Sequence, residues 1–88
     1  MTNTELYSLA LSTYGAEAQT LMVMEEMAEL QKELCKHARG KDNQLAIAEE
    51  IADVLIMLGQ MIVLHGCEEI VAQYKQKKLE RLKERLKQ

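Results

Sequence analysis

Two short acidic motifs are the residues of this sequence best suited to chemistry. Residues 25–29 read EEMAE and residues 49–53 read EEIAD, so one acidic spacing occurs twice. Because residues three and four apart share a helix face, each motif gathers its acids on one side. The second motif runs into an apolar stretch, and an unpaired carboxylate buried there costs several kcal/mol. The pattern therefore predicts that these acids face a cation.

The break at residues 40–43, GKDN, places the two motifs opposite each other. A four-residue connection predicts two antiparallel helices. Glu29 precedes Gly40 by eleven residues and Asp53 follows Asn43 by ten. At roughly 1.5 Å per residue, both acids lie about 15–16 Å from the turn. The hairpin is thus expected to bring the two acidic clusters into the same layer.

Carboxylates that converge between apolar helices raise one another's pKa values and push the helices apart unless a cation joins them. A set of ligands made only of oxygen suits a hard ion, Mg²⁺ or Mn²⁺. A di-iron bundle would use Glu-x-x-His, and neither His37 nor His65 follows a Glu by three residues. A single EExxE is weak evidence, but acids matched in depth across a hairpin favour the metal interpretation.

Breaks that contain glycine at 13–15, 40–43 and 65–67 divide the chain into helices. We expect these helices at residues 4–12, 16–39, 44–65 and 68–86. Asn43 or Asp42 is expected to cap the third helix. The sequence lacks proline and is rich in strong helix formers, so it predicts an all-α fold, with residues 1–88 as a single domain.

The third expected helix is apolar nearly all round, which is typical of a central helix. We expect the fourth helix to cover one of its faces. One chain of 88 residues has little left to cover the others. The outward residues Ile56, Ile62 and Val63 are therefore expected to pack against a second copy.

Charge and composition exclude several classes of function. The formal net charge of −3 combines ten acids within residues 1–53 with seven Lys and Arg within residues 75–88. Three tyrosines are the only aromatic residues, which does not fit a nucleic-acid groove. The most apolar run, 51–64, is too short for a membrane span. Cys35 and Cys67 are expected to be buried thiols in a cytoplasmic protein.

The run EEMAEL, followed across the hairpin by EEIADVLIML, resembles the MazG-like nucleoside triphosphate pyrophosphohydrolases of the all-α NTP pyrophosphatase superfamily. The resemblance covers roughly residues 15–85. It implies a four-helix core that assembles as a dimer or a tetramer. It also implies cleavage between the α- and β-phosphates of a nucleoside triphosphate, which yields a monophosphate and pyrophosphate. The implied Mg²⁺ ligands are Glu26, Glu29, Glu50 and Asp53.

Further roles follow with less support from the motifs themselves. Family members often carry basic residues on the fourth helix for the phosphates, which points to Lys75, Lys78 and Arg81. The leading acids Glu25 and Glu49 are expected to orient or deprotonate the attacking water, unless they face solvent. The base is not identified by any motif, although a pocket near the start of the second helix, at residues 16–39, would be lined by Gln19, Met22 and Tyr14.

Two other classes of function remain open at this point. In one alternative, the chain is a metal-stabilised helical interaction module that keeps the fold of an enzyme but has no catalytic activity. A nucleotide-binding regulator that senses rather than cleaves is the other possibility. The intact set of acids argues against lost chemistry, because Mg²⁺ binding has little other use in such a module.

Overall fold

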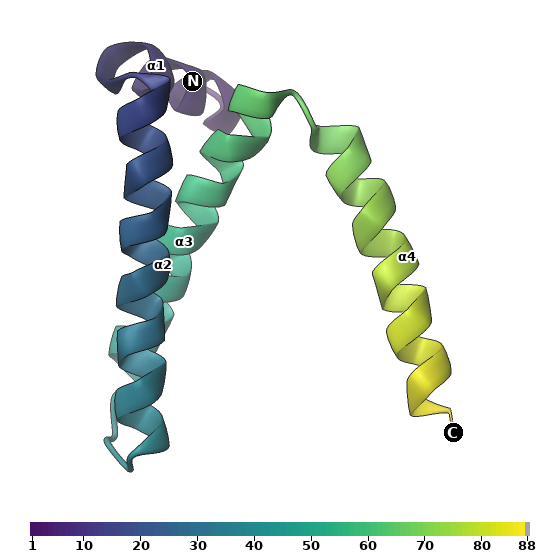
Figure 1. Ribbon diagram of the computed structural model, residues 1–88. Helices are drawn as coiled ribbons and strands as arrows, with labels where there is room; N and C mark the ends of the chain where they lie inside the picture. The colour runs from purple at the N-terminus through teal and green to yellow at the C-terminus, as the bar shows by residue number, and fades with distance from the viewer. Residues whose placement is uncertain (88) are drawn as a thin grey trace.

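The computed structural model describes residues 1–87, and this part of the chain is entirely helical apart from its turns (Figure 1). The helices are α1 (Asn3–Tyr14), α2 (Ala16–Ala38), α3 (Gln44–His65) and α4 (Glu68–Leu86). The predicted all-α fold is confirmed, and the predicted boundaries agree to within two residues. The glycine at each break has a positive φ, as the pattern predicted.

Helix α1 is defined at both ends by local hydrogen bonds. Thr2 and Glu5 form a capping box, in which each side chain accepts from the other residue's backbone N–H. At the far end the Gly15 N–H donates to the Leu11 carbonyl at 2.9 Å, and the φ of 95° at Gly15 turns the chain into α2. The ring of Tyr7 lies directly over Gly59, where an added Cβ would come within 2.5 Å of Cε2. Glycine at 59 therefore lets α1 approach α3 closely.

Helices α2 and α3 form the antiparallel hairpin that the sequence predicted (Figure 1). Its buried apolar residues are Val23, Val54 and Met57. Beside them the side-chain amides of Gln19 and Gln60 are buried, and Gln19 Nε2 donates to Gln60 Oε1 at 2.6 Å. This polar pair joins the two helices inside an otherwise apolar layer.

The connection between the two hairpin helices differs from the prediction. Asn43 stands at the N-terminus of α3, but its side chain turns back to α2 instead of capping the helix. Its Nδ2 donates to the carbonyl oxygen and to Oε1 of Glu33, both at 3.0 Å. Hydrogen bonds from Asn43 and then Lys36 lower the pKa of Glu33 below its usual range. Asn43 therefore ties the turn to the last turns of α2.

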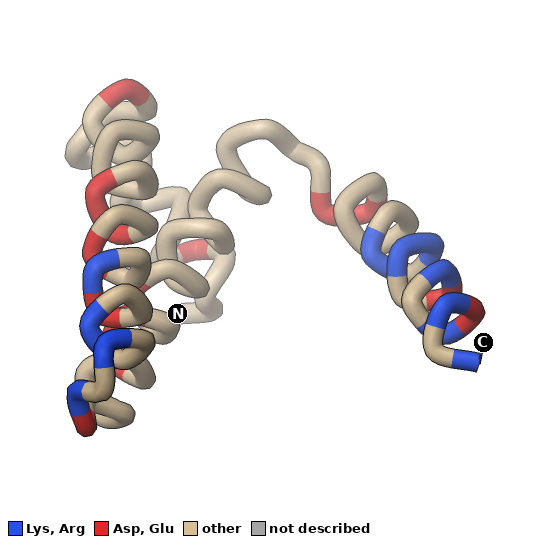
Figure 2. The backbone as a smooth tube through the Cα atoms, turned by 60° about the horizontal axis from the view of Figure 1, so that its bottom comes forward, with Lys and Arg blue, Asp and Glu red and all other residues tan. Residues whose placement is uncertain are grey.

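Helix α4 departs most from the expectation. It was predicted to cover one face of α3, yet it stands apart from the hairpin in both Figure 1 and Figure 2. In the preceding turn Gly66 has a left-handed φ of 57°. Its N–H donates to the carbonyl of Val63, and the N–H of Cys67 donates to the carbonyl of Ile62, both at 3.2 Å. This pair of bonds is a Schellman motif, which ends α3. The same bond pattern at residues 40 and 41 ends α2, so the motif alone does not set the direction of the helix that follows.

The expected buried thiols are a third correction, because Cys35 is exposed and Cys67 is half-buried. With α4 turned away, the interior is thin, and each hairpin helix buries only part of its circumference. Many large apolar side chains are exposed for the same reason, among them Met24, Leu55 and Ile56. Within residues 1–87, no helix has both the length and the apolar character needed to cross a bilayer.

Candidate metal centre

Three of the predicted acids meet at one side of the hairpin. Glu26 comes from α2, and Glu50 and Asp53 come from α3. One carboxylate oxygen of each lies within 4.8 Å of the others, and all three residues are half-buried. The two acidic motifs therefore contribute to a single cluster.

The core of the hairpin explains why these acids converge. Val23 lies three residues before Glu26, and Val54 directly follows Asp53. Burial of both valines holds α2 against α3, so the acids at the edge of this contact are carried toward each other. Because Glu50 lies three residues before Asp53 on the same helix, it shares that edge.

The cluster is electrostatically unfavourable without a cation. The pKa of Glu26 is raised, first by partial burial and then by the negative charges of Asp53 and Glu29. Burial, followed by the charges of Asp53 and Glu26, likewise raises the pKa of Glu50. A cation among these oxygens would favour the ionised forms and remove the repulsion.

The donor set fits a small hard cation. Six-coordinate Mg²⁺ binds oxygen at about 2.0–2.1 Å, so neighbouring ligand oxygens lie about 3 Å apart. Oxygens already within 4.8 Å of one another reach that spacing by small side-chain rotations. Three carboxylates leave further coordination positions for water or for substrate phosphates. The arrangement can therefore hold Mg²⁺ and present it to an anionic ligand.

The remaining predicted acids lie around this cluster rather than within it. Glu29 is exposed one turn along α2 from Glu26, and its charge contributes to the raised pKa of both Glu26 and Glu50. Its role as a fourth ligand stays a prediction. Glu25 and Glu49 are also exposed, each beside a member of the cluster.

The three predicted phosphate-binding residues are not brought to the cluster within one chain. Lys75, Lys78 and Arg81 are all exposed on α4, which stands away from the hairpin. Figure 2 shows basic residues along α4 and acidic residues on α2 and α3. A single chain thus separates the cations from the acids that they were expected to complement.

The residues of the predicted base pocket lie in two different environments. Gln19 is buried and already bonded to Gln60, whereas Tyr14 and Met22 are exposed. The pocket stays a prediction for Met22 and Tyr14. For Gln19, a contact with a nucleotide base would require the side chain to break its buried hydrogen bond with Gln60.

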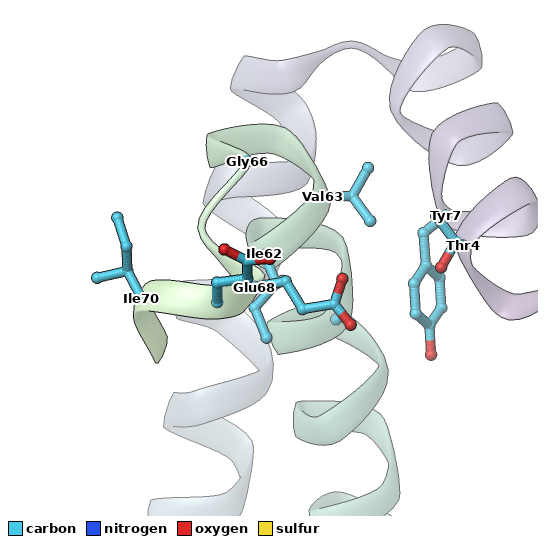
Figure 3. Close-up of a pocket in the computed structure, with 9 residues that line it drawn as sticks. Thr4, Tyr7, Ile62, Val63, Gly66, Glu68 and Ile70 are labelled. Carbon is cyan, nitrogen blue, oxygen red and sulfur yellow. The ribbon is translucent and has the colours of Figure 1, made fainter. Parts of the chain in front are cut away.

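Sequence reasoning did not find the cavity beside α1, which has a volume of about 590 Å³. It lies between α1, the end of α3 and the start of α4, with Tyr7, Ile62 and Glu68 among its lining residues (Figure 3). Its one signal in the sequence is Gly59, since a glycine inside an apolar helix marks a close approach of another element. Val63 also lines this cavity, so two of the residues expected to meet a second copy face it.

Comparisons with protein-family models, with curated proteins and with solved structures each find no match to this chain.

Mg²⁺ is expected to raise the melting temperature of the protein, because an ion that binds only the folded state stabilises it by mass action. For a millimolar site, about 10 mM Mg²⁺ contributes about 1.4 kcal/mol. In a domain of this size that corresponds to a shift of roughly 6–11 °C. Differential scanning calorimetry with and without EDTA measures it, and a melting temperature that does not change with Mg²⁺ would count against the site.

Proposed function

We propose that this protein is a Mg²⁺-dependent nucleoside triphosphate pyrophosphohydrolase. The observation that carries the proposal is the convergence of Glu26, Glu50 and Asp53 from the two acidic motifs. The resemblance of those motifs to the MazG-like family supports it and supplies the reaction. The reaction breaks the bond between the α-phosphorus and the oxygen that bridges it to the β-phosphorus. Water supplies the new oxygen on the α-phosphorus, and pyrophosphate leaves.

In this proposal the chain contributes charge and orientation. Glu26, Glu50 and Asp53, with Glu29 beside them, hold Mg²⁺ at the edge of the hairpin. When bound, Mg²⁺ supplies charge neutralisation of the triphosphate and activation of water. Glu25 or Glu49 accepts the proton of that water or orients it. Basic residues of α4 complement the phosphates.

The two rival functions are supported less well. A module that serves only interaction has no use for three half-buried carboxylates in which the charge of Asp53 raises the pKa values of Glu26 and Glu50, because that repulsion opposes folding. A regulator that senses nucleotides would keep the same Mg²⁺ ligands but would not turn over. Binding and product formation must therefore be measured separately.

The test is a panel of ribonucleoside and deoxyribonucleoside triphosphates incubated with the protein and Mg²⁺. Separation of products by ion exchange should give a monophosphate and pyrophosphate for at least one of them. In ¹⁸O-labelled water, the label should appear in the monophosphate, since the attack is at the α-phosphorus. Release of a diphosphate and orthophosphate would contradict the proposed reaction. Calorimetric binding of a nucleotide without turnover would favour the sensor.

A further inference from the structure

One face of α4 carries an apolar stripe with two cations at its centre. Val71, Tyr74, Leu79 and Leu82 remain between 40% and 60% exposed. They line a shallow groove together with Lys75 and Lys78. At about 100° per residue, positions 71, 75, 78 and 82 fall within about 60° of one another. We call this surface the α4 stripe.

A helix of 19 residues standing in solvent gains little stability from its own backbone. Its stability normally comes from packing an apolar face against another element. The α4 stripe thus needs a cover, and three candidates exist within copies of this chain. They are the hairpin of the same chain, the α4 stripe of a second copy, and the hairpin of a second copy.

The position of α4 disfavours the hairpin of the same chain. This helix stands apart from α2 and α3 in both Figure 1 and Figure 2. The apolar residues of the α4 stripe are therefore left 40–60% exposed by their own chain.

Charge disfavours pairing of two α4 stripes. Lys75 and Lys78 lie at the centre of the stripe, so two stripes in contact would bring four ammonium groups together. Glu80 and Glu84 provide no compensation there, because they fall on the opposite side of the helix by the same 3.6-residue period. Glu68 lies on the side of the stripe, but two turns before Lys75. Like charges placed across an interface weaken the association.

The acidic side of the hairpin has the complementary properties. We call it the acidic face and define it by Glu26, Glu29, Glu49, Glu50 and Asp53. Exposed apolar residues flank these acids, since Met22 precedes Glu29 by two turns and Ile56 follows Glu49 by two turns. The acidic face thus offers both apolar area and negative charge to a stripe that is apolar and positive.

We propose that the α4 stripe of one copy docks on the acidic face of a second copy. Reciprocal exchange of the two α4 helices gives a two-fold symmetric dimer, in which the same pair of surfaces meets twice. Lys75 and Lys78 of each copy then lie beside the acidic cluster of the other. One consequence rests on the proposed function: each site would receive its phosphate-binding lysines from the partner.

The mass of the full chain in EDTA, at low salt and without nucleotide, tests the assembly. Light scattering over a dilution series should show a dimer. The variant Lys75→Gln/Lys78→Gln should raise the dimer Kd at least about tenfold, because it removes the charge pairs across the interface. The matched variant Lys77→Gln/Lys83→Gln makes the same change of charge outside the stripe and should leave the Kd within about threefold of wild type.

The same measurement separates the alternatives. If Lys75→Gln/Lys78→Gln instead tightens the dimer, the two α4 stripes face each other and the proposal is wrong. A wild-type chain that stays monomeric to about 100 µM, far above the Kd of stable complexes, would also overturn it. Neither result depends on hydrolysis. The proposed dimer can therefore be contradicted while the proposed function stands, and the proposed function can be contradicted while the dimer stands.

Mixing two inactive variants tests the origin of the lysines. Asp53→Asn and Lys75→Gln/Lys78→Gln are combined at equal amounts, well above both dimer Kd values. If the lysines come from the partner, each mixed dimer has one intact site, and activity should reach about a quarter of wild type. If the lysines act within their own chain, the mixture should show no gain over the separate variants, and the assignment to the partner is wrong.

Discussion

The substitution Asp53→Asn is expected to lower nucleotide hydrolysis by about 100-fold or more. Asp53 shares an oxygen cluster with Glu26 and Glu50, and the amide has no negative charge to offer a cation. A metal ion stabilises the charge of the transition state of such reactions by several kcal/mol. Because each 1.36 kcal/mol corresponds to a factor of ten in rate, a loss of about 3 kcal/mol lowers the rate by about 100-fold. Initial rates of pyrophosphate release at saturating Mg²⁺ measure the loss.

The same variant should fold at least as well as the wild type in EDTA. After burial, the charge of Asp53 is the largest cause of the raised pKa of both Glu26 and Glu50, so its removal relieves repulsion in the metal-free protein. Melting curves in EDTA at pH 7 test this, and the variant should also lose the response to Mg²⁺. Asp42→Asn, the same change at an exposed residue of the turn, is the matched control. If Asp53→Asn unfolds while the wild type stays folded in EDTA, Asp53 is a structural partner rather than a ligand.

The substitution Gln60→Leu is expected to destabilise the hairpin by about 1–3 kcal/mol. Gln60 and Gln19 are 5% and 7% exposed, and they form a side-chain hydrogen bond at 2.6 Å. Leucine at position 60 leaves the buried Nε2 group of Gln19 without its acceptor, and such a donor retains the full cost of its lost hydration. Urea unfolding, with the transition midpoint and slope compared, gives the change in free energy.

A second substitution distinguishes this explanation from a steric one. The double variant Gln19→Leu/Gln60→Leu removes both polar groups and should recover most of the lost stability, because neither amide is then left unpaired. Gln73→Leu, at an exposed position of α4, is the control for the general effect of the change. If the double variant is less stable than Gln60→Leu alone, the packing of leucine in this layer, and not the lost hydrogen bond, explains the result.

Helix positions and the depth of the two acidic motifs could be predicted from the sequence alone. The helices end at Gly15, near Gly40 and at Gly66, because glycine adopts the positive φ that closes a helix without strain. The rise per residue of a helix is nearly constant, so counting from the turn places Glu29 level with Asp53 and the two acidic clusters in the same layer. These features depend on local geometry, which varies little between proteins.

The tertiary structure determined the features that depend on how each helix is rotated about its axis and on the direction in which it runs. How each helix is rotated about its axis placed Glu26 in the cluster and left Glu29 exposed, although one motif contains both. Asn43 binds Glu33 instead of the start of α3, because the turn brings it within reach of the preceding helix. The direction of α4 depends on the backbone angles of its turn, because the hydrogen-bond pattern at residues 66 and 67 also occurs at residues 40 and 41, where the next helix folds back. Residue types alone do not specify that geometry, and it is what separates the basic helix from the acids of its own chain.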